Sequence, residues 1–207
     1  MKNKSVPCAI LFFIVVGLTG CGAASVQKSM RSLSFGDDIS IVYTAHAFSE
    51  TPSLVQQVVY EKGDEIYEFT AMVDVRDASV TIAGLSSLGN RQFLLTMNDN
   101  LLTYDAEPLF ELPFPPQYLM RDFMLVFAGR DELLRQQPGL TLSDEGQVRV
   151  VHSGEQQFVS ITYEARGFVI GEVVLKHNAV GYTLRIATVQ ANVSSVVTQP
   201  SDDKLLE

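Results

Sequence analysis

The chain has 207 residues, of which 15 are lysine or arginine and 24 are aspartate or glutamate, giving a formal net charge of −9. This length suits a single domain that can bury a sizeable hydrophobic core. The acidic balance argues against binding to nucleic acid and against charge-driven attraction to anionic lipids.

The N-terminal residues have the order of a bacterial lipoprotein signal peptide. Lys2 and Lys4 precede an apolar run from Cys8 to Leu18, and the tetrapeptide Leu18-Thr19-Gly20-Cys21 resembles a lipobox. A transmembrane helix needs roughly 20 apolar residues and this run is about half as long. The segment is therefore expected to be a signal peptide and not a membrane span.

This resemblance implies that residues 1–20 are removed and that Cys21 becomes an acylated N-terminus. Several acyl chains together anchor a protein firmly in a membrane. Gly22 follows the cysteine where the enterobacterial sorting rule would place aspartate for retention at the inner membrane. The expected location is thus the outer membrane, facing the periplasm. With Cys8 removed and Cys21 acylated, no disulfide or cysteine-based site is expected.

Residues 21–38 mix small and polar side chains and are expected to form a tether or a short helix. The domain is expected to span residues 39–199, followed by a polar tail at residues 200–207. In the first half of the domain, apolar and polar residues alternate with a period of two, which predicts two hairpins and a further strand. The predicted strands are Leu54 to Tyr60, Tyr67 to Val73, Ala78 to Ile82, Phe93 to Met97, and Leu101 to Tyr104.

The middle of the chain predicts a helix. Pro115 and Pro116 stand at the start of the segment from Gln117 to Ala128, and Gly129 lies just past its end. Arg121 and Asp122 are expected to face away from its apolar side. On a helical wheel, one broad arc holds Leu119, Met120, Phe123, Met124, Val126 and Phe127. Residues 131–136 are expected to add a short second turn.

After Pro138-Gly139 the period of two returns and predicts four or five more strands. They fall at Val148 to Val151, Val159 to Tyr163, Val169 to Leu175, and Val180 to Ile186. An antiparallel sheet with one apolar face needs a cover, and an apolar helix can supply it. The expected fold is mostly β: an incomplete antiparallel barrel with a central helix plugging its concave face.

The region from about Leu54 to Ile186 resembles the LolA and LolB family, the periplasmic carrier and outer-membrane receptor of lipoproteins. The strand-loop-strand segment from Val80 to Phe93, with Leu85 and Leu88 in its loop, and the proline-preceded helix carry this resemblance. The chain is most similar to a LolB-like lipoprotein family found beside aryl-polyene and fatty-acid-like biosynthesis genes. It departs from the receptor in having no tryptophan.

The resemblance implies a half-barrel cavity for an acyl-type cargo and a loop leucine that meets the membrane. Leu85 or Leu88 would be that leucine. The cavity wall would consist of Leu119, Met120, Phe123, Met124 and Phe127. The alternative is that these side chains form a dry core and that both leucines are buried. The implied partners are an acyl or polyene lipid or a lipoprotein cargo, the inner leaflet of the outer membrane, and a LolA-like periplasmic carrier.

The sequence contains no arrangement typical of an enzyme. His46, His152 and His177 are isolated and lie in no HExxH motif, and the segment from Gly84 to Gly89 lacks the GxSxG spacing. We expect no catalytic residue, no metal and no cofactor. Two functions are left: a carrier of hydrophobic cargo, or a non-catalytic envelope scaffold with a filled core.

Overall fold

The computed structural model describes residues 48, 50–76, 79–99, 101–108, 110–136 and 139–195, and the backbone of residues 26–27, 33–34 and 40–41. The expected signal peptide, the expected acylation site Cys21 and the polar tail lie outside these residues. Within the stretch expected to be a tether or helix, Val26–Gln27 and Leu33–Ser34 form the short strands β1 and β2.

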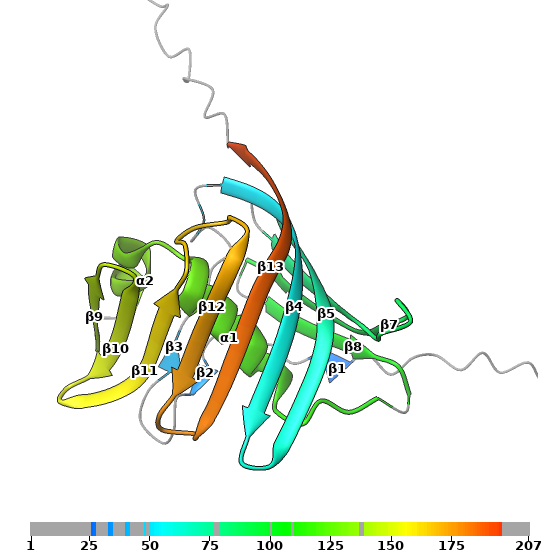
Figure 1. The fold of residues 1–207 in the computed structure, drawn as a ribbon, viewed down its shortest axis with the longest axis horizontal. Helices are drawn as coiled ribbons and strands as arrows, with labels where there is room; N and C mark the ends of the chain where they lie inside the picture. Colours follow the sequence, from blue (N-terminus) through cyan, green and yellow to red (C-terminus); the bar gives the residue numbers. More distant parts are fainter. Residues whose placement is uncertain are drawn as a thin grey trace, which may run out of the picture.

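A large antiparallel sheet curls around helix α1, Pro116–Phe127, and a short helix α2, Arg130–Gln136, follows it (Figure 1). Strand β2 pairs with β3, Ser40–Ile41, in a separate small sheet. The first half of the large sheet contains β4 (Glu50–Lys62), β5 (Glu65–Arg76), β6 (Ser79–Leu85), β7 (Arg91–Asn98) and β8 (Leu101–Ala106). The second half contains β9 (Leu140–Glu145), β10 (Val148–Ser153), β11 (Gln156–Tyr163), β12 (Gly171–His177) and β13 (Tyr182–Ser195).

The order of strands in the large sheet is β1-β8-β7-β6-β5-β4-β13-β12-β11-β10-β9. Two meanders, β4 to β8 and β9 to β13, therefore flank α1 in sequence and join through the long pairing of β4 with β13. The strands β1 and β9 form the two outer edges, so the barrel stays open. The predicted incomplete antiparallel barrel with a central helix is confirmed.

Alternating side chains give the sheet an apolar inner face. In β4, Leu54, Val58 and Tyr60 are buried while the residues between them, except Gln56, are more exposed. Gly84 of β6 lies opposite Phe93 of β7, and a Cβ atom at position 84 would lie only 2.0 Å from the Phe93 ring. Glycine is needed here because the ring of Phe93 fills the space that another side chain would occupy.

The predicted helix is confirmed, but the prediction that two of its polar residues face away from the core is wrong. Arg121 is 0% exposed and Asp122 is 2% exposed, and every residue from Leu119 to Val126 is buried. The helix contacts β12 of the large sheet and also β2 of the small one. The pair of charges turns inward because Tyr182 of β13 supplies a hydrogen-bonding partner there.

The predicted short second helical turn is also confirmed, as α2. Asp131 and Glu132 lie in its first turn and Arg135 in its last, the distribution that a helix dipole favours. In the described part of the chain, neither helix combines the length and apolar character needed to cross a bilayer.

Candidate functional site

The space beneath the N-terminal half of α1 is filled. Side chains from β4, β13 and the segment before α1 close around it and leave no room for a water molecule. The ring of Tyr60 lies 4.5 Å from that of Phe114 and 5.2 Å from that of Tyr182, measured between ring centroids. The residues that close this space are Tyr60, Phe114, Tyr118, Leu119, Asp122, Tyr182 and Leu184.

A buried polar cluster holds this half of the helix to the sheet. Arg121 Nε donates to Asp122 Oδ1 at 2.9 Å, and its guanidinium lies 4.2 Å from the centre of the Tyr118 ring. The Tyr182 hydroxyl accepts from Arg121 and donates to Asp122. Burial raises the pKa of Asp122, and the neighbouring charge of Arg121 opposes that shift. Removing one partner of such a pair destabilises the fold strongly, because the other charge would then be buried without an opposite charge beside it.

His177 extends the cluster along β12. Its ring stacks on Tyr182 at 5.1 Å, and its Nδ1 accepts a hydrogen bond from the backbone N–H of Val180 at 3.2 Å. Burial, together with the charge of Arg121, lowers the pKa of His177 to about 3. The imidazole is therefore neutral over the pH range in which a free histidine titrates. In the described residues, no three histidine, cysteine or acidic side chains group as a metal site would require.

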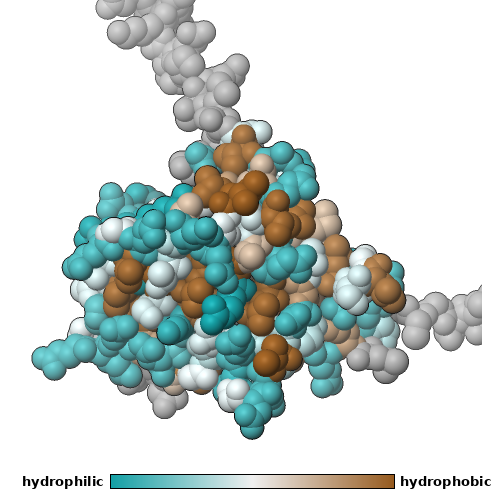
Figure 2. Space-filling model, in the orientation of Figure 1, coloured by the Kyte–Doolittle hydropathy of each residue, from teal (hydrophilic) through white to brown (hydrophobic). Residues whose placement is uncertain are grey.

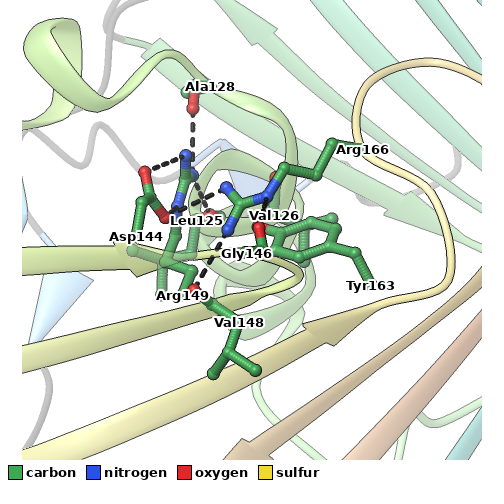
Figure 3. A network of polar contacts seen from close by, with 9 residues as sticks. All are labelled: Leu125, Val126, Ala128, Asp144, Gly146, Val148, Arg149, Tyr163 and Arg166. Atoms are coloured by element: carbon green, nitrogen blue, oxygen red, sulfur yellow. Dashed lines mark hydrogen bonds and ion pairs between the residues drawn. The ribbon is translucent and has the colours of Figure 1, made fainter.

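The C-terminal end of α1 is held by a second network, drawn in Figure 3. Arg149 of β10 donates through Nη1 to the carbonyl oxygens of Leu125, at 2.7 Å, and Ala128, at 3.0 Å. The Tyr163 hydroxyl donates to the carbonyl of Val126 at 2.9 Å. The last carbonyls of a helix lack partners within the helix, and a cation there is favoured by the helix dipole. These two side chains thus cap α1 from the sheet.

Asp144 orients the arginine that caps the helix. Its carboxylate accepts from Arg149 Nε and from Arg166 Nη1, both at 3.0 Å. Partial burial raises the pKa of Asp144, but hydrogen bonds and charge from the two arginines outweigh burial, so the pKa lies below its usual value. Arg166 also donates to the carbonyls of Gly146 and Val148. The network fixes the loop between β11 and β12, residues 164–170, beside the end of the helix.

A cleft of about 770 Å³ opens at this end of α1. Three aromatic rings line it, those of Phe48, Phe127 and Phe168. The buried Phe123 packs against two of them: between ring centroids, Phe127 lies 4.8 Å from Phe123 and 5.3 Å from Phe168, and Phe48 lies 5.7 Å from Phe123 and 5.8 Å from Phe168. The four rings come from three distant segments of the chain. We call the three rings that line the cleft, Phe48, Phe127 and Phe168, the phenylalanine floor.

Charged residues form the rim of the cleft. Glu132 and Arg135 of α2 make an ion pair at 2.6 Å. The remaining rim residues are Glu50, Gly129, Arg130, Asp131 and Gly167. Immediately beyond Phe168, Val169 is 45% exposed and Ile170 is 69% exposed. An apolar floor within a charged rim suits an amphiphilic ligand, whose polar part can stay in water.

The structure places the residues predicted for a cargo cavity in two environments. Leu119, Met120, Phe123 and Met124 are packed in the core, while Phe127 is half-buried and reaches the cleft. Sequence reasoning missed Phe48 and Phe168 because both lie outside the periodic segments. An available signal was the apolar run Phe168-Val169-Ile170, which directly follows the loop residues Arg166 and Gly167.

The two leucines predicted for a membrane-contacting loop also differ. Leu85 ends β6 and is half-buried, whereas Leu88 is 84% exposed. The turn that carries Leu88 is closed by backbone hydrogen bonds of 2.9 Å from Gly89 to Ser86 and from Ser86 to Asn90. The alternative in which both leucines are buried is therefore wrong for Leu88.

Comparison with curated proteins finds no match to the chain. Among solved structures, it is similar to a LolA superfamily protein from Nitrosomonas europaea, with 7% sequence identity, a TM-score of 0.40, and coverage of 72% of this chain and 88% of that one. Residues 53–190 match the family described as "Protein of unknown function (DUF3261)". Because this span runs from β4 to β13 and includes both helices, the chain belongs to the DUF3261 family.

Proposed function

We propose that this protein is a lipid-anchored, non-enzymatic carrier that binds a hydrophobic, acyl-type cargo in the cleft and passes it to the outer membrane. The observation that carries the proposal is the phenylalanine floor: an open cleft with three aromatic rings in its lining, in a half-barrel that is closely packed beneath the N-terminal half of α1. The anchor would be the acylated Cys21, which would hold the domain on the periplasmic side of the membrane.

The size and chemistry of the cleft support an acyl-type ligand. Ligand pockets commonly enclose about 300–1,000 Å³ and combine an apolar lining with a few polar groups, and the cleft, at about 770 Å³, lies in that range. Each methylene group moved from water onto the phenylalanine floor would contribute at most about 0.8 kcal/mol, the value for full burial. The charged rim would leave a head group or a peptide segment in water.

Two cargoes fit this chemistry. One is the acyl part of a lipoprotein, received from a LolA-like periplasmic carrier. The other is a polyene or fatty-acyl lipid, whose flat or extended chain would lie along the aromatic rings. Either cargo would leave the protein at the inner leaflet of the outer membrane, and the exposed Leu88 would assist that step by entering the lipid.

A glycine on the rim allows a sharp test of the cleft. Gly129 has open space around the position of a Cβ atom, and so has Gly139, which lies outside the cleft lining. The variant Gly129→Trp would fill the cleft, and Gly139→Trp is its matched control. The measurement is mass spectrometry of non-covalently bound lipid that co-purifies with each protein from membranes.

We expect acyl lipid with the unmodified chain and with Gly139→Trp, and at least tenfold less with Gly129→Trp. Equal amounts in all three proteins, or none in the unmodified chain, would contradict the carrier proposal. The filled interior beside Tyr182 favours the second candidate in that case, a non-catalytic envelope scaffold whose cleft holds no lipid.

A further inference from the structure

An apolar band crosses the outer face of the sheet. In β4 to β7, the residues Val55, Met72, Ala83 and Leu94 each lie between two inward-facing buried neighbours, so their side chains point outward. The strand register aligns them in one row, Val55 with Met72, Met72 with Ala83, and Ala83 with Leu94. We call these four residues, together with Val189 and Ile170, the apolar band.

The band continues from β4 to the mouth of the cleft. Val55 lies opposite Gln190, the neighbour of Val189, across the β4 and β13 pairing. The next strand begins at Gly171, which pairs with Thr188, so Ile170 comes beside Val189. Val189 is 51% exposed and Met72 is 50% exposed. Figure 2 shows hydrophobic side chains gathered over the upper part of β13, β4 and β5, with hydrophilic ones predominating toward β9 to β12.

A second row on the same face has the opposite character. Ser160, Lys176, Thr183 and Glu61 are aligned by the register of β11, β12, β13 and β4. Next to the apolar band, two aspartates have hydrogen-bonding partners on neighbouring strands or on their own strand. Asp74 accepts from Ser53 and Arg76, and Arg91 donates to Asp105 at 3.1 Å. The band is thus an uncharged surface on an otherwise acidic molecule.

The far end of the band lies near β1, which begins a few residues after the expected anchor at Cys21 in the sequence. Leu94 pairs with Asp105 of β8, and the adjacent Tyr104 pairs with Val26 of β1. Val26 is the fifth residue after Cys21, and an extended chain spans at most about 3.6 Å per residue, so the anchor can lie at most about 18 Å from this edge. A tether this short gives even a weak surface contact a high effective concentration.

From these observations we infer that the apolar band is a docking surface for the lipid bilayer, which turns the outer face of β4 to β7 toward the membrane. The inference rests on the proposed acyl anchor at Cys21 and not on the identity of the cargo. The net negative charge disfavours anionic lipid, so the contact is with zwitterionic lipid. Because Ile170 lies two residues after Phe168, this orientation brings the phenylalanine floor next to the bilayer.

The absence of tryptophan makes the orientation directly measurable, since one introduced tryptophan is the only one in the chain. Met72→Trp and Val189→Trp report from the band, and Lys176→Trp reports from the polar row as the matched control. Each acylated full-length protein is reconstituted into phosphatidylcholine vesicles, with and without brominated acyl chains, and the tryptophan fluorescence is compared. Vesicle sedimentation and mass spectrometry of the N-terminus establish anchoring separately.

Bromine should quench the two band reporters at least threefold more than the Lys176→Trp reporter. Equal quenching at all three positions, or none, in a protein that sediments with vesicles would overturn the docking surface while leaving the anchor in place. A blue shift in Met72→Trp that follows protein concentration without bromine quenching would identify a second copy as the occupant and also overturn it. A chain that is neither acylated nor sedimented would overturn the anchor and this orientation together, whereas loss of co-purifying lipid alone would affect only the cargo proposal.

Discussion

The two ends of α1 are built in opposite ways. At the N-terminal end, charges and phenol groups are buried and closely packed, with Arg121, Asp122 and Tyr182 hydrogen-bonded together. At the C-terminal end, the charged side chains cap the helix from the sheet and the phenylalanines Phe127 and Phe168 border an open cleft. The closed end fixes the position of the helix, and the open end leaves apolar surface available for a ligand.

Because the two ends differ, the apolar residues of the helix belong either to the packed core or to the cleft. Met120 and Met124 are adaptable side chains that could line a pocket, yet both are 0% exposed and belong to the core. The proposed binding site lies instead where the packing is incomplete, at residues of the end of the helix and of the loop before β12. The comparison predicts large stability effects at the closed end and large binding effects at the open end.

The largest effect on stability is expected for Asp122→Ala. The substitution would leave Arg121 buried without its carboxylate, and breaking a buried ion pair in this way typically costs about 3–5 kcal/mol. The measurement is the free energy of unfolding in urea. Asp131→Ala on the exposed face of α2 is the control and should change stability by less than about 0.5 kcal/mol. A loss below about 1 kcal/mol for Asp122→Ala would show that the cluster does not hold the helix.

The closed end also predicts a pH dependence. The folded chain protonates His177 only near pH 3, whereas the unfolded chain does so near pH 6.5. Between these values the unfolded state binds one more proton, so stability falls as the pH is lowered, by about 1.4 kcal/mol per unit. From pH 6.5 to pH 4.5 the loss should be about 2.3 kcal/mol, because at pH 6.5 half of the unfolded chains already carry the proton.

Comparison with variants isolates the contribution of His177 from that of the carboxylates. His177→Gln should remove this part of the pH dependence of the unfolding free energy, and His152→Gln should retain it. Equal pH profiles for the unmodified chain and His177→Gln would contradict the assignment of a neutral, buried imidazole.

Tryptophan introduced at the closed end and at the open end of α1 tests directly whether the two ends differ in packing. Met124→Trp would overpack the filled core and cost about 1–3 kcal/mol. Gly129→Trp has open space around it and should cost less than about 1 kcal/mol, the cost of losing glycine before a helix. Thermal denaturation and lipid co-purification together separate the two outcomes. If Met124→Trp left stability unchanged and abolished lipid binding, the cavity would lie under the helix and not at its end.

The smallest effect on stability is expected at the loop between β6 and β7. Leu88→Glu changes a side chain that is 84% exposed, so the free energy of unfolding should shift by less than about 0.5 kcal/mol. Transfer of bound lipid to vesicles, followed by fluorescence of a labelled fatty acid, should slow, while binding in solution should persist. Unchanged transfer would restrict the role of this loop to closing the hairpin.

The sequence by itself determined the local elements. A period of two predicted the strands on both sides of the helix, because side chains of a strand alternate between its faces. The two prolines and Gly129 delimited α1 to within a few residues, because proline fits the first turn of a helix and glycine suits its end. For the loop leucines the sequence left two alternatives open, a protruding leucine implied by the family resemblance or two buried ones, and the structure decides for an exposed Leu88.

Only the tertiary structure decided which faces are covered and where the interior stays open. A helical wheel places Arg121 and Asp122 opposite the apolar arc but contains no information about Tyr182, which lies about sixty residues later and turns that side inward. The phenylalanine floor likewise joins residues near positions 48, 125 and 168. Periodicity is a property of neighbouring residues, whereas burial, pKa shifts and clefts depend on contacts between distant ones. The pairing of β4 with β13, the first and last long strands, brings those distant segments together.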